Sequence, residues 1–74
     1  MARLKPLPFR EVARRLRAAG FVEVGQRGSH VKFIRSSQEG TRVAVVPRHP
    51  EVRMGTLRSI LNQAGLTPEE FENL

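Results

Sequence analysis

Two residues of this chain, His30 and Lys32, combine the types and the spacing that suit chemistry on a phosphodiester. Side chains alternate between the two faces of a β-strand, so residues 30 and 32 would share one face of a strand here. Val31 and Phe33 would share the opposite face, which must turn to the core because both are apolar. An imidazole exists in neutral and protonated forms near neutral pH, so it can accept a proton from a 2′-hydroxyl or donate one to a leaving oxygen. A neighbouring ammonium group can stabilise the charge of the transition state, so this strand predicts RNA cleavage by His30.

The three residues before His30 have the composition of a phosphate-binding turn. Gly28 carries no side chain, so the backbone of this turn can approach a phosphate and donate hydrogen bonds from its amides. The alternative is that Gly28 is an ordinary turn residue, and the sequence does not separate the two. Ser29 is not expected to act as a nucleophile with His30, because adjacent strand residues point to opposite faces. We therefore predict His30 as the catalytic residue and RNA contacts from Arg27, Gly28, Ser29 and Lys32.

The second histidine, His49, lies in the segment Pro47-Arg48-His49-Pro50. Flanking prolines hold the backbone extended and fix the direction in which the side chain points. This segment therefore predicts a second phosphate contact, made by Arg48 and His49. The alternative is a rigid, solvated connector between two elements.

Positive charge dominates the chain, with 13 lysine and arginine residues against seven glutamates and a net charge of +6. All 13 cations but only four of the glutamates lie in residues 1–66, which therefore carry +9. Such a field attracts polyanions, and nucleic acid is the partner that it predicts. Lys5 and the arginines at positions 10, 14, 15 and 17 would guide RNA phosphates towards the site. The alternative is that the excess charge serves only solubility.

Composition also excludes several kinds of site. Cysteine is absent, which excludes disulfides and thiolate chemistry. Two histidines, no aspartate and scattered glutamates do not provide a metal site. Neither a P-loop nor a dinucleotide-binding pattern is present, so no small-molecule cofactor is expected. A length of 74 residues predicts one domain over residues 1–74. No stretch is long and apolar enough to span a bilayer, which predicts a cytoplasmic location. The alternative of a membrane-surface helix over residues 8–19 is disfavoured by its narrow apolar stripe without tryptophan, so no membrane partner is expected.

Apolar periodicity predicts an α+β fold. Residues 8–20 have helical spacing, and a second helical pattern is entered through the Gly55-Thr56 step and closed by Gly65. Strand-like runs cover residues 21–26, 29–35 and 41–46, the last stopped by Pro47. Residues 67–70 have the pattern of a helix cap and predict a short helical turn after it. The four phenylalanines lie at positions that face the core in these patterns, so they are not expected to stack on bases. The order α-β-β-β-α predicts a three-stranded antiparallel sheet with both helices on one face and the other face open.

Three blocks of sequence carry a resemblance to a known family. They are Gly28-Ser29-His30-Val31-Lys32-Phe33, Val46-Pro47-Arg48-His49-Pro50 and Gly55-Thr56-Leu57-Arg58-Ser59-Ile60-Leu61. In this order they resemble the HicA-type mRNA interferase toxins, and the resemblance runs from about Val12 through Phe71. The segment Leu7-Pro8-Phe9 departs from the pattern, because a small polar helix cap is expected there.

The resemblance implies a double-stranded-RNA-binding-domain-like fold with the same α-β-β-β-α order. It also implies cleavage of mRNA by the histidine of the Gly-Ser-His motif, here His30, with Gly28 and Ser29 shaping its loop and His49 bordering the site. A HicB-type antitoxin would occlude this face, and the free toxin would arrest translation and growth.

We therefore expect the toxin of a type II toxin–antitoxin system, a metal-independent endoribonuclease that uses the 2′-hydroxyl of its RNA as nucleophile. Two other functions stay open. A non-catalytic RNA-binding module would use His30 as one more contact, and a protein-interaction domain would use its basic face only for an acidic partner. The sequence does not assign the second proton-transfer group, for which solvent is one candidate.

Overall fold

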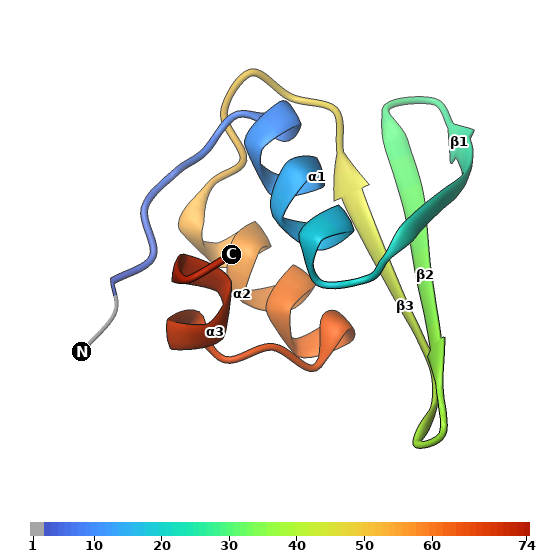
Figure 1. Cartoon of the computed structure of the whole chain (residues 1–74). Coiled ribbons are helices and arrows are strands. Elements are labelled where there is room, and N and C mark those ends of the chain that lie inside the picture. Colours follow the sequence, from blue (N-terminus) through green and yellow to red (C-terminus); the bar gives the residue numbers. More distant parts are fainter. Residues whose placement is uncertain (1–2) are drawn as a thin grey trace.

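A computed structural model describes residues 3–74, in which helices cover one side of a three-stranded sheet (Figure 1). The elements are α1 (Phe9–Ala18), β1 (Val22–Arg27), β2 (His30–Ser37), β3 (Gly40–Pro47), α2 (Met54–Ala64) and α3 (Pro68–Glu72). Each strand runs antiparallel to the next in the order β1-β2-β3. The α+β class, the element order and the three-stranded antiparallel sheet expected from the sequence are confirmed. The sheet face turned away from the helices is uncovered (Figure 1).

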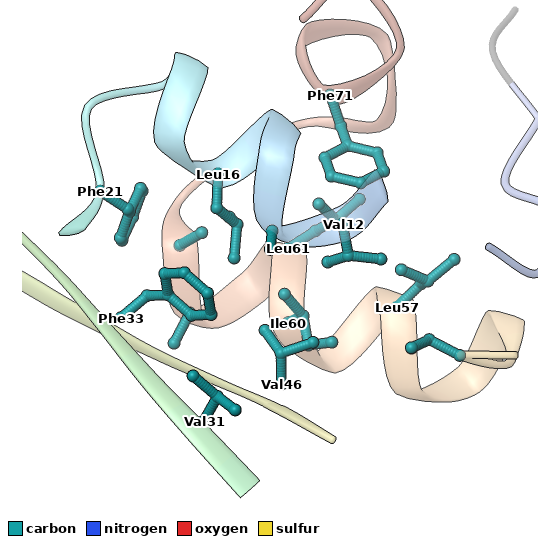
Figure 2. Packing of buried hydrophobic residues seen from close by; sticks show 14 residues of the cluster. Val12, Leu16, Phe21, Val31, Phe33, Val46, Leu57, Ile60, Leu61 and Phe71 are labelled. Atoms are coloured by element: carbon teal, nitrogen blue, oxygen red, sulfur yellow. The ribbon is translucent and has the colours of Figure 1, made fainter. Parts of the chain in front are cut away.

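The central strand β2 divides core from surface by alternation along the chain. Val31 and Phe33 have no exposed surface, whereas His30 and Lys32 are exposed on the open face. Pairing with β3 continues the pattern, because Val31 lies opposite Val46, which is also fully buried. The other core side chains come mainly from α1 and α2: Val12, Ala13, Leu16, Phe21, Ala44, Val52, Leu57, Ile60, Leu61, Ala64 and Phe71 (Figure 2).

Helix α1 begins without a polar side-chain cap, which explains the departure at residues 7–9. Its N-cap is Pro8, and the backbone N–H of Phe9 donates instead to the carbonyl of His49 at 3.1 Å. Just before the helix, Leu7 and Val52 form an antiparallel bridge. The His49 carbonyl therefore replaces a side-chain cap. Together with the bridge between Leu7 and Val52, this bond connects the 49–52 segment to the start of α1.

The C-terminal elements follow their sequence signals closely. Helix α2 begins at Met54, so Gly55 lies in its first turn and does not lead into it as the sequence suggested. It ends at Ala64 and is capped by Gly65, whose φ of 72° is a left-handed conformation that glycine adopts readily. The predicted cap of α3 is confirmed: the hydroxyl of Thr67 accepts from the Glu70 N–H at 3.1 Å, and the Glu70 carboxylate accepts from the Thr67 N–H at 2.8 Å.

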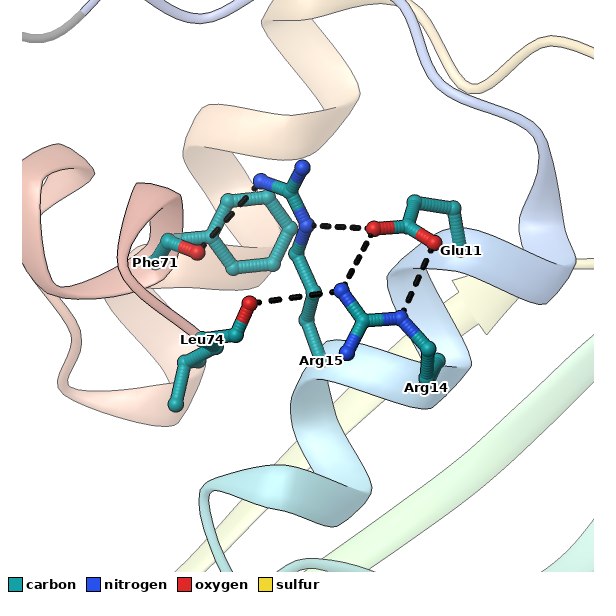
Figure 3. Close-up of polar contacts among 5 residues, drawn as sticks. All are labelled: Glu11, Arg14, Arg15, Phe71 and Leu74. Atoms are coloured by element: carbon teal, nitrogen blue, oxygen red, sulfur yellow. Dashed lines mark hydrogen bonds and ion pairs between the residues drawn. The ribbon is translucent and has the colours of Figure 1, made fainter.

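A polar cluster joins α1 to the C-terminal end of the chain (Figure 3). Arg14 donates to both carboxylate oxygens of Glu11, at 3.0 and 2.7 Å, and Arg15 donates to the same carboxylate at 2.8 Å. Arg14 also donates to the carbonyl of Leu74 at 3.2 Å, while the Arg15 guanidinium lies 4.9 Å from the centre of the Phe71 ring. Hydrogen bonds from Arg14 and then from Arg15 lower the pKa of Glu11 from 4.5 to about 2.

This cluster predicts a pH-dependent contribution to stability. Because folding lowers the pKa of Glu11, its ion pairs stabilise the fold above pH 4.5 and are lost as the pH falls towards about 2. A Glu11→Gln variant should therefore melt at a lower temperature than wild type at pH 7, by a small amount since the group is near the surface. Thermal unfolding followed at several pH values should show this difference shrinking as the pH approaches 2. A difference in Tm that does not change with pH would contradict the assignment.

Candidate active site

His30 is the first residue of β2 and follows a two-residue turn. It lies between Arg27 of β1 and Pro47 of β3, its partners in the two antiparallel ladders. Pro47 is thus the last paired residue of β3, one position beyond the expected end of this strand. In the turn, Gly28 has a φ of 60° and a Cβ there would meet nothing within 4 Å, so backbone conformation and not crowding accounts for glycine. Glycine at the first turn position, followed by Ser29 without positive φ, is the pattern of a type II′ hairpin.

Hydrogen bonds fix this turn to the segment that carries His49. The backbone N–H of Arg48 donates to the carbonyl of Ser29 at 2.5 Å. The side chain of Gln26 donates to the carbonyl of Gly28 at 2.9 Å and accepts from the Arg48 guanidinium at 3.1 Å. That guanidinium lies 4.6 Å from the centre of the Phe9 ring. The residue before each histidine is therefore bonded to the residue before the other.

The two histidines line one cleft between the sheet, the 47–53 segment and α2. Its lining consists of His30, Val45, Pro47, His49, Glu51, Val52, Arg53, Thr56 and Gln63. Gln63 also holds the edge of the sheet, because its side-chain oxygen accepts from the backbone N–H of Val45 at 2.9 Å. Both imidazoles are exposed, so each is accessible to a ligand that enters this cleft.

A second hollow lies on the open face of the sheet. Its lining consists of Gly25, Gln26, Arg27, His30, Lys32 and Val45. His30 belongs to both hollows, with Arg27 and Lys32 beside it in this one. The outward orientation that the alternation predicts for residues 30 and 32 is confirmed, and so is the presence of cationic side chains around His30.

Lys5 and the arginines of α1 line neither of these two hollows. Lys5 lines a separate hollow together with Arg15 and residues of α3, and this hollow does not include His30. Arg14 and Arg15 pair with Glu11, and Arg17 donates to Glu23 at 3.2 Å. The cationic residues that share a hollow with His30 are Arg27, Lys32 and Arg53, which come from the strands and from the segment before α2.

Sequence reasoning missed three residues that build the site. Phe9 was expected in the core, but it is only partly buried and supports the Arg48 guanidinium. Gln26 and Gln63 position the turn and the edge of β3 through bonds to residues distant in sequence. Their only sequence signal is a polar amide near a strand end or on a helix, which by itself indicates no role.

Within residues 3–74, no three histidine, aspartate or glutamate side chains gather in a group that could hold a metal ion. In the same part of the chain, no helix combines the length and the apolar character needed to cross a membrane.

The fold and the site define a class: a small, basic α+β protein with an exposed histidine among cationic side chains on the open face of its sheet. Residues 9–66 match the sequence model of a family described as HicA toxin of bacterial toxin–antitoxin. The chain belongs to this HicA toxin family. It is therefore the toxin of a toxin–antitoxin pair, with a cognate antitoxin as partner. No curated protein matches the sequence.

Proposed function

We propose that this toxin is an mRNA interferase, an endoribonuclease that cuts RNA with His30 as a proton-transfer residue. The observation that carries the proposal is the exposed imidazole at the start of β2, which lines one hollow with Arg27 and Lys32. A phosphodiester seated there would place its charge among cations and its reacting oxygens within reach of an imidazole, the side chain used most often for proton transfer in catalysis.

The reaction uses the RNA as its own nucleophile. A proton leaves the 2′-hydroxyl, the 2′-oxygen attacks the adjacent phosphorus, and the bond from phosphorus to the 5′-oxygen breaks. The products are a 2′,3′-cyclic phosphate and a 5′-hydroxyl. His30 moves one of the protons, and Lys32 with Arg27 stabilises the extra negative charge on the phosphoryl oxygens. No step of this scheme requires a metal ion.

RNA binding in this proposal uses the surface around the turn. Arg27, Lys32 and Arg48 supply positive charge, while backbone amides of Gly28 and Ser29 can face a phosphate because no Cβ projects from Gly28. Lys5 lies in another hollow, so its part is to attract RNA at longer range and not to contact the reacting phosphate.

Control of the toxin, in this proposal, comes from a HicB-type antitoxin. An antitoxin that covers the open face of the sheet would block His30 and the surrounding cations at once. Negative charge on the antitoxin surface would favour such a complex, because it would pair with the cations that otherwise attract RNA.

A substrate with one altered sugar tests the proposed chemistry. The purified toxin is incubated with a labelled single-stranded RNA, the cut position is mapped, and a second RNA carries 2′-deoxyribose on the 5′ side of that position. We expect the first RNA to give cyclic-phosphate ends and the second to resist cleavage there while it still binds. Cleavage at the deoxy position would show that water attacks instead. Binding of both RNAs without any product would indicate a non-catalytic RNA-binding module, and either result would overturn the proposal.

A further inference from the structure

We propose that His49 is the second proton-transfer residue of this site and acts together with His30. This inference rests on the proposed function, since it assigns a role within the same reaction. His49 then takes the place of solvent as the second proton-transfer group, and the 47–50 segment belongs to the catalytic machinery.

The chemistry calls for two proton transfers at one phosphodiester. The 2′-hydroxyl must lose a proton as its oxygen attacks phosphorus, and the departing 5′-oxygen must gain one as its bond to phosphorus breaks. One imidazole accepts the first proton and another, already protonated, donates the second. The two rings end the step with their protonation states exchanged, and exchange with water restores them.

The structure brings His49 into the same cleft as His30. Register places His30 opposite Pro47, which precedes His49 by two positions, and the Arg48 N–H bonds to the carbonyl of Ser29. The two segments that carry the imidazoles are therefore joined directly by backbone contacts beside each ring.

The backbone of His49 is itself held on both sides. Its N–H donates to the carbonyl of Pro47 at 2.8 Å, and its carbonyl accepts from the N–H of Phe9 at 3.1 Å. Pro50 follows and restricts the conformation of His49. A ring on a backbone fixed in this way can keep its position relative to a bound phosphate, as proton transfer requires. A freely moving connector would have no need of these contacts.

Two other ionisable side chains in this cleft are compared with His49 as candidates for the second proton transfer. Besides the two histidines, its lining includes Glu51 and Arg53. An arginine does not give up its proton in proteins, so Arg53 can supply charge but not acid–base catalysis. Glu51 also lies in the cleft, and Glu51→Gln removes its ability to exchange a proton while nearly keeping its shape. This variant therefore tests Glu51 as the rival to His49 for the second proton transfer.

The test uses two RNAs that differ by one atom. In the second, sulfur replaces the bridging 5′-oxygen at the cut position, and a thiolate leaves without being protonated because a thiol is far more acidic than an alcohol. Single-turnover cleavage by wild type, His30→Ala, His49→Ala, His49→Gln and Glu51→Gln is measured on both RNAs. Affinity for the uncleavable 2′-deoxy RNA is measured alongside, and circular dichroism checks each fold.

We expect His49→Ala and His49→Gln to cleave the normal RNA about 10²- to 10⁴-fold more slowly than wild type, with little change in affinity or fold. The sulfur-containing RNA should rescue only one of the two histidine positions, which identifies that residue as the proton donor and the other as the acceptor. Glu51→Gln should lose much less activity on the normal RNA than either His49 variant.

Three results would overturn this inference while leaving the proposed function intact. They are full activity of the His49 variants, a loss explained by weaker RNA binding, and a pattern in which neither or both histidine positions are rescued by sulfur. Failure of wild type to cut the normal RNA would instead refute the proposed function itself, so the two failures are distinguishable.

Discussion

His30→Ala is expected to lower the rate of RNA cleavage by about 10²- to 10⁴-fold, the usual contribution of a positioned acid or base. The ring is exposed and contributes nothing to the buried core, so its removal should leave the fold almost unchanged. RNA affinity should also persist, because Arg27 and Lys32 remain in the same hollow. Cleavage of a labelled RNA under single-turnover conditions, together with growth of cells expressing the variant, measures the effect.

A control on the same strand makes this result specific. Ser36 lies on the same face of β2 as His30, six residues along, where it pairs with Thr41. Ser36→Ala should therefore cleave RNA and arrest growth like wild type. Undiminished cleavage by a folded His30→Ala protein would refute the catalytic assignment. Loss of RNA binding in that variant would make His30 a contact residue instead.

The local elements of this fold could be predicted because their signals are short-range. Alternation along residues 30–33 correctly separated buried from exposed side chains, and the Thr67 and Glu70 pair correctly indicated the cap of α3. Each of these signals depends on neighbours within a few positions, so a single sequence contains them in full. Strand ends were predicted less accurately, because β3 extends through Pro47, the residue that was expected to stop it.

The surroundings of His30 were harder to predict because they depend on contacts between distant segments. Arg48 reaches both Gln26 and Phe9, which are separated from it by 22 and 39 positions along the chain. No periodicity encodes such contacts. For the same reason, the charge pattern that predicts a guiding role for Lys5 does not reveal that Lys5 lies in a hollow without His30.

Helix α1 has no polar side chain at its N-cap, yet its first backbone N–H is still hydrogen-bonded. Helix N-termini need acceptors for their free N–H groups, and a polar side chain at the cap is the usual solution. Here the carbonyl of His49 accepts from Phe9, so a loop distant in sequence replaces the cap. The same bond restrains a candidate catalytic residue, which links the stability of α1 to the geometry of the site.

Phe33→Ala is expected to remove a large part of the stability of the fold, because the ring has no exposed surface. Its neighbours include the Phe9 ring, with centroids 6.4 Å apart, and the Arg17 guanidinium at 5.7 Å from the Phe33 ring centre. Truncating a buried phenylalanine costs about 3–5 kcal/mol. Domains carry roughly 0.05–0.15 kcal/mol of stability per residue, or about 4–11 kcal/mol at this length, so the variant should lose at least about a quarter of its stability and would be unfolded at the low end of this range.

Lys32→Ala, one position earlier on the same strand, should leave the stability almost unchanged and weaken RNA binding instead. Its side chain is exposed on the open face, so the free energy of unfolding should change by no more than about 0.5 kcal/mol. Urea titration measures both variants, with Phe33→Leu as a milder core change if Phe33→Ala does not fold. RNA affinity should instead fall for Lys32→Ala, because a cation that shares a hollow with His30 is lost. Equal stability losses at positions 32 and 33 would mean that this strand does not separate core from surface, and His30 would then lose the orientation on which its proposed chemistry depends.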